Sequence, residues 1–103
     1  MVEGHRGVVW TVSARDSLDE IIEYVSIDSP VGAEKVLDLV LAAVESLSQL
    51  SERGRLVPEI ASPDFREIFV YRYRVIYQIS ASEVRILAVI HDAMDFMARF
   101  DQE

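Results

Sequence analysis

Three arginines and one histidine are the side chains best suited to chemistry on an anion. Arg66, Arg72 and Arg74 fall within a nine-residue stretch, and His91 closes a later apolar run. Guanidinium groups hold phosphates and carboxylates in a fixed geometry, and a histidine exchanges protons near neutral pH. These residues therefore suggest either a site that holds a scissile phosphate or a surface that binds another protein.

The same residues also have purely structural interpretations. Arg66 can pair with Glu67, and Arg74 can pair with acids of the helices and so orient a sheet. His91 can end a strand and bond to Asp92 or to a backbone carbonyl. The sequence leaves both kinds of interpretation open.

Composition places these side chains in one small globular domain, residues 1–103. The chain is 50% apolar and 27% charged, and it contains no cysteine, which excludes disulfides and thiolate chemistry. We see no metal-ligand cluster and no phosphate-binding glycine loop, and expect no cofactor. The sequence shows neither a signal peptide nor a membrane span, so we expect a cytoplasmic location.

The net charge of −8 disfavours a broad nucleic-acid-binding surface. The charge is uneven, because residues 53–90 hold six arginines against four acids whereas residues 1–52 hold three basic and ten acidic side chains. An anionic partner would therefore meet the chain within residues 53–90.

The first half predicts a strand followed by two helices. Residues 8–12 are β-branched and aromatic, which favours a strand. Apolar side chains then recur at helical spacing up to residues 26–28, after a cap at Ser13 or Ser17. Ser29-Pro30 opens a second helix, and the short connection predicts an antiparallel hairpin.

The second helix is expected to end at Gly54 as a left-handed cap, after which the pattern changes. Strands are predicted over residues 56–58, 65–70, 73–79 and 84–90, with the first at a sheet edge because of Pro58. Turns are expected at Tyr71-Arg72 and residues 80–83, and a last helical turn at residues 95–100. The prediction is an α+β fold with the helical hairpin packed on a mostly antiparallel sheet of four to five strands.

An ordered string of motifs runs through the second half. It reads Gly54-Arg55-Leu56-Val57-Pro58-Glu59, Phe65-Arg66-Glu67-Ile68, Tyr73-Arg74-Val75-Ile76-Tyr77 and Ile86-Leu87-Ala88-Val89-Ile90-His91. This string resembles the RelE/ParE superfamily of toxins, also called plasmid-stabilisation proteins, and within it the ParE-like branch. The resemblance implies the same fold that the periodicity predicts.

The resemblance also implies a function, the toxin of a type II toxin–antitoxin pair that a cognate antitoxin holds silent. The ParE-like branch poisons DNA gyrase by protein binding, whereas the RelE branch cuts messenger RNA on the ribosome. The partners implied are an antitoxin and gyrase, or alternatively the ribosome and mRNA. The resemblance is also compatible with a homodimer or a toxin–antitoxin heterotetramer.

Departures from the family pattern favour protein binding over RNA cleavage. Ribonuclease members place basic residues near the positions of Phe65, Glu67 and Asp92, so only Arg74 and His91 remain as catalytic candidates. The family usually has an arginine three residues after His91, where this chain has Met94. Methionine cannot clamp a phosphate, which leaves open a non-toxic relative that only binds the antitoxin.

For a protein-binding role, the candidate contact residues are Arg66, Arg72, Arg74, Tyr73, Met94 and Phe96. Strand alternation places Arg72 and Arg74 on one face and Tyr73 on the other. Tyrosines in strands often serve as packing residues. The apolar residues near the C-terminus form either a partner patch or a last turn that closes the core.

Overall fold

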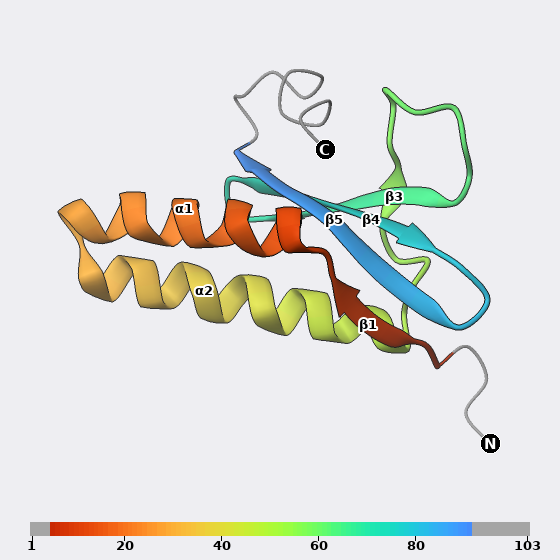
Figure 1. Cartoon of the computed structure of the whole chain (residues 1–103), viewed down its shortest axis with the longest axis horizontal. Helices are drawn as coiled ribbons and strands as arrows, with labels where there is room; N and C mark the ends of the chain where they lie inside the picture. Colours follow the sequence, from red (N-terminus) through yellow and green to blue (C-terminus); the bar gives the residue numbers. More distant parts are fainter. Residues whose placement is uncertain (1–4, 92–103) are drawn as a thin grey trace.

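The computed structural model describes residues 5–91, in which a helical hairpin covers one face of a five-stranded sheet (Figure 1). The elements in order are β1 (Gly7–Trp10), α1 (Val12–Asp28), α2 (Pro30–Glu45), the 3₁₀ turn η1 (Ser46–Ser48), β2 (Arg55–Leu56), β3 (Phe65–Val70), β4 (Tyr73–Ile79) and β5 (Glu83–His91). The predicted α+β architecture is confirmed. The expected turn at 95–100, together with Met94 and Phe96, lies outside the described residues.

The sheet order is β1-β5-β4-β3-β2. β2, β3, β4 and β5 pair antiparallel in succession, and β1 joins β5 in parallel. Parallel neighbours need a crossover connection, and the helical hairpin begins the path that leads from β1 to the rest of the sheet. The sheet is therefore mostly antiparallel, as the sequence predicts. It has five strands, the upper end of the predicted four to five.

Thr11 caps the N-terminus of α1, two residues before Ser13 and six before Ser17, the serines that the sequence suggests as caps. Its hydroxyl oxygen accepts a hydrogen bond from the Ala14 amide at 3.1 Å. Ser17 instead lies inside the helix, where its hydroxyl donates to the Ser13 carbonyl at 2.9 Å. The predicted cap at Ser13 or Ser17 is thus wrong, because threonine at the strand end already satisfies a free helical amide.

Ser29 separates the two helices and caps the second, as predicted. Its hydroxyl oxygen accepts from the Gly32 amide at 2.9 Å, and Pro30 occupies the first turn. A single residue between the helices forces them to run antiparallel, which Figure 1 shows.

Gly54 does not end α2, which stops at Glu45 and continues as η1. The glycine lies instead against β4, where its amide donates to the Tyr77 hydroxyl at 3.0 Å and that hydroxyl donates to the Ser51 carbonyl at 2.8 Å. A Cβ at residue 54 would clash with the Tyr77 hydroxyl and come within 2.6 Å of the Glu67 carbonyl oxygen. Close backbone approach, rather than a left-handed conformation, therefore requires glycine here.

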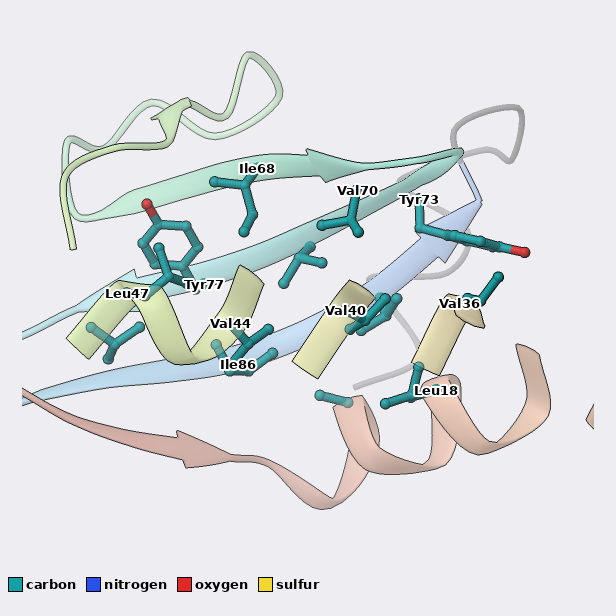
Figure 2. Close-up of a cluster of buried hydrophobic side chains, with 14 residues drawn as sticks. Leu18, Val36, Val40, Val44, Leu47, Ile68, Val70, Tyr73, Tyr77 and Ile86 are labelled. Carbon is teal, nitrogen blue, oxygen red and sulfur yellow. The ribbon is translucent and has the colours of Figure 1, made fainter. Parts of the chain in front are cut away.

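The main core fills the space between the helices and the sheet (Figure 2). Helical residues such as Leu18, Val40 and Val44 meet strand residues such as Ile68 and Ile86. A second, smaller cluster lies on the outer face of the sheet, opposite the helices; its buried members are Val57, Ile76, Ala88 and Ile90. Both faces of β4 are thus covered, which explains why the first five residues of β4 are buried.

A β-bulge in β5 changes which face its later residues occupy. Tyr77 pairs with Ile86 and Ile76 pairs with Ala88, so Leu87 is the extra residue. Before the bulge Ile86 faces the helices, and after it Val89 does so. The bulge therefore turns His91, two residues beyond Val89, toward the helix side of the sheet.

Candidate functional site

Arg74 lies at the centre of a four-residue charge cluster on the outer face of the sheet. Its Nε donates to Oε1 of Glu67 at 2.7 Å, and its Nη1 and Nη2 atoms form a bidentate pair with Glu59 at 3.2 and 3.0 Å. Glu67 also accepts from Nε of Arg55 at 2.5 Å. The side chain of Glu67 is 0% exposed and that of Arg74 10%, so the centre of the cluster is withdrawn from solvent.

The cluster is electrically balanced, with two guanidinium groups and two carboxylates. Burial opposes the charge on Arg74, but the hydrogen bonds that Arg74 donates to Glu59 and Glu67 outweigh this effect and raise the pKa of the guanidinium. The hydrogen bond from Arg74 in turn holds the pKa of Glu59 below its usual value. Arg74 therefore stays charged and paired with these carboxylates.

The expected partners of Arg74 were acids of the helices, and that expectation is wrong. Arg74 alternates with Tyr73 along β4 and faces away from the helices, where Glu67 is two strand positions distant and the loop after β2 brings Glu59 over the sheet. The interpretation that Arg74 forms structural salt bridges is confirmed, but its partners are Glu59 and Glu67.

His91 lies on the other face of the sheet from Arg74. It is the register partner of Tyr73, and the two rings meet edge to face with centroids 5.5 Å apart. Tyr73 belongs to the core beneath the helices, whereas Arg74 and its register partner Ile90 face outward. The structure thus does not bring the two catalytic candidates around one point.

The other candidate arginines occupy separate places. Arg66 faces the helix side and donates from Nη1 to the carbonyls of Gly54 at 2.9 Å and Glu52 at 3.3 Å, rather than to Glu67 as expected. Arg72 is exposed in the β3–β4 turn, with its guanidinium carbon 5.6 Å from the centre of the Tyr71 ring. Tyr73 is buried in the core, so little of its surface remains for a partner.

Sequence reasoning missed the part that Glu59 and Arg55 play in this charge cluster. Glu59 and Arg55 belong to the Gly54–Glu59 motif, but nothing in the residue types shows that the following loop folds back over the outer face. Tyr71 was expected as a turn residue, and its backbone angle φ of 58° confirms the turn. That angle is uncommon for a residue with a side chain, and the absence of glycine from the turn was the available signal.

Comparison with known proteins decides the family. A protein-family model described as the ParE toxin of the type II toxin–antitoxin system parDE matches residues 8–96. The chain belongs to the ParE toxin family. This confirms the resemblance read from the motifs, and it identifies an antitoxin as the kind of partner that such a chain has.

Two similar proteins accompany this ParE-family assignment. Toxin RelE2 of Caulobacter vibrioides is 33% identical over 87 residues, which cover 84% of this chain and 94% of the relative. A solved structure, the chromosomal ParDE TA system from P. aeruginosa, matches with a TM-score of 0.71 at 23% identity, over 86% of this chain and 98% of the other. The structural match shows that this ParE-family chain shares that fold.

No helix within residues 5–91 of this ParE-family chain is long and apolar enough to cross a membrane.

Proposed function

We propose that this chain is the toxin of a toxin–antitoxin pair and that it acts by binding a protein, with DNA gyrase as the target. The observation that carries the proposal is the pairing of Arg74 with Glu59 and Glu67. Gyrase is the target that the ParE-like branch implies, and a cytoplasmic site of action follows from it.

Phosphodiester cleavage would need a cation that is available to the developing charge of the phosphate. Three nitrogens of Arg74 already bond to carboxylates, and these acids would repel an incoming phosphate. His91 lies on the opposite face of the sheet, so a proton would have to cross the sheet to pass between His91 and a phosphate held at Arg74. Binding another protein requires neither the release of Arg74 from its carboxylates nor proton transfer by His91.

A second candidate is an mRNA endoribonuclease of the RelE type, which the relative named Toxin RelE2 brings into consideration. It would require Arg74 to leave its two acids and act together with His91. A third possibility, a non-toxic relative, follows from Met94 in place of the usual arginine.

Pulse labelling after induction of the isolated chain in bacteria separates these candidates. DNA synthesis and protein synthesis are followed side by side for the unaltered chain and for His91→Gln. We expect DNA synthesis to stop first and the His91→Gln chain to act equally well. Earlier arrest of protein synthesis that His91→Gln abolishes would instead establish the ribonuclease, and arrest of neither process would establish the non-toxic relative.

A further inference from the structure

The joined ends of α1 and α2 project past the sheet at one end of the molecule (Figure 1). The buried residues of the 17-residue helix α1 are Ala14 and Leu18, so residues 19–28 all remain at least partly exposed. The buried positions of α2 begin only at Ala33. We call residues 19–34 the hairpin tip, and its surface contributes little to the fold.

The outward face of α1 in the hairpin tip carries two large apolar side chains among acids. Glu20, Glu23, Tyr24, Ile27 and Asp28 recur at the spacing of one helix face, and all five residues are exposed. Tyr24 and Ile27 are each 77% exposed, the highest value for a large apolar residue among residues 5–91. Each apolar side chain therefore has a carboxylate one helical turn away.

The exposed apolar side chains of the hairpin tip are not needed for packing. Among residues 5–91, Tyr24 and Ile27 neither belong to nor pack against the two hydrophobic clusters, and the same holds for Val31, which is 65% exposed in the first turn of α2. Alanine would also form a helix more readily than tyrosine or isoleucine. Single exposed apolar residues are ordinary, but three within eight residues at a projecting end indicate an interaction surface.

The charge of the hairpin tip restricts what can bind there. Residues 19–34 hold five acidic side chains and no basic one, in a chain with a net charge of −8. This surface repels phosphate groups, which disfavours nucleic acid and anionic membranes as ligands. It equally repels the hairpin tip of a second copy. The complementary surface is that of a protein with an apolar centre and a basic rim.

We propose that the hairpin tip is the surface through which this chain contacts its target enzyme, and that the target offers an apolar pocket ringed by basic side chains. The inference rests on the proposed function, which gives DNA gyrase as the target. Tyr24 is the central anchor, because tyrosine is enriched among the residues that dominate binding. Glu20 and Asp28, one helical turn to either side of Tyr24, pair with the basic rim and orient the two proteins.

The test measures binding of the purified full chain to purified gyrase. In a double variant, Tyr24→Ala with Ile27→Ala, the dissociation constant should rise by roughly 30-fold, the effect typical of losing an anchor. The double variant should melt at the temperature of the unaltered chain or higher, because neither side chain packs in the core and alanine favours the helix. Val12→Ala is the matched control, since Val12 is 70% exposed at the other end of α1 and its loss should leave binding unchanged.

A charge reversal tests the basic rim separately. Glu23→Lys should weaken binding to gyrase and reduce its dependence on salt. Glu45→Lys makes the same charge change at the exposed last residue of α2, at the far end of the hairpin, and should alter binding much less. Equal effects of the two reversals would show that only net charge matters and would overturn the assignment of a basic rim.

The remaining outcomes separate this inference from the proposed function. If the unaltered chain does not bind gyrase, both fail. If it binds and the double variant binds equally well, the assignment of the hairpin tip is overturned while gyrase remains the target. If sedimentation shows that the unaltered chain self-associates and that the double variant has lost only this self-association, the hairpin tip joins two copies, and the assignment to the target is likewise overturned.

Discussion

Arg74 and His91 lie on opposite faces of the sheet, although their register partners on β4 and β5 are adjacent. Tyr73 pairs with His91 and Arg74 pairs with Ile90, so one residue step along β4 separates the two faces. The bulge at Leu87 contributes to this separation, because one extra residue moves every later residue of β5 to the other face of the sheet. Two residues that look like catalytic partners in the sequence are thus separated by the sheet itself.

Removing the charge of Glu67 should strongly destabilise the fold. Its side chain is 0% exposed between Arg55 and Arg74, so Glu67→Gln leaves a buried guanidinium with one carboxylate fewer. We expect the free energy of unfolding in urea to fall by about 3 kcal/mol. Glu83→Gln, which breaks the exposed pair with Arg85, should cost under about 1 kcal/mol, and equal losses would contradict the structural role of the cluster.

Gly54 should not tolerate a methyl group. The Cβ of Gly54→Ala would meet the Tyr77 hydroxyl and the Glu67 carbonyl, so we expect a loss of about 2–3 kcal/mol in the free energy of unfolding. Gly7→Ala is the matched control, because no atom lies within 4 Å of the added Cβ, and its effect should stay within about 0.5 kcal/mol. If Gly54→Ala were as stable as Gly7→Ala, the backbone of Gly54 would not lie as close to Tyr77 and Glu67 as the structure shows.

Stability should decline in acid partly through Glu59. The hydrogen bond from Arg74 lowers the folded-state pKa of Glu59 below the ordinary 4.5, so its contribution is present above that value and is lost as the pH falls through the folded-state pKa. The free energies of unfolding in urea of the unaltered chain and of Glu59→Gln should therefore differ most above pH 4.5 and converge only as the pH falls below it, through the folded-state pKa. A difference that stays constant over this range would show that Glu59 gains nothing from its pairing.

Local residue patterns were sufficient to predict the helices and most strands. The helical spacing of α1 and α2, the Ser29-Pro30 start and the β-branched runs of β3 and β4 each reflect a nearby physical preference. The end of α2 was misplaced because glycine marks both helix caps and close approaches of backbone. Only the fold shows that Gly54 meets Tyr77, which is 23 residues away in the sequence.

The candidate site was harder to predict, because its geometry depends on a bulge and a returning loop. The alternation within β4 correctly separated Arg74 from Tyr73. The face of His91 depended on the extra residue Leu87, which has no distinctive side chain, and the partner Glu59 comes from a loop that no periodicity describes. Contacts of this kind are fixed by tertiary packing rather than by local propensity.

Supercoiling of DNA by purified gyrase, in the presence of the purified chain, is the most direct test of gyrase as the target. We expect the unaltered chain and His91→Gln to inhibit supercoiling equally, while mRNA on translating ribosomes stays intact. The proposal of gyrase as the target would be contradicted by undiminished supercoiling together with ribosome-dependent cleavage of mRNA that is lost in His91→Gln.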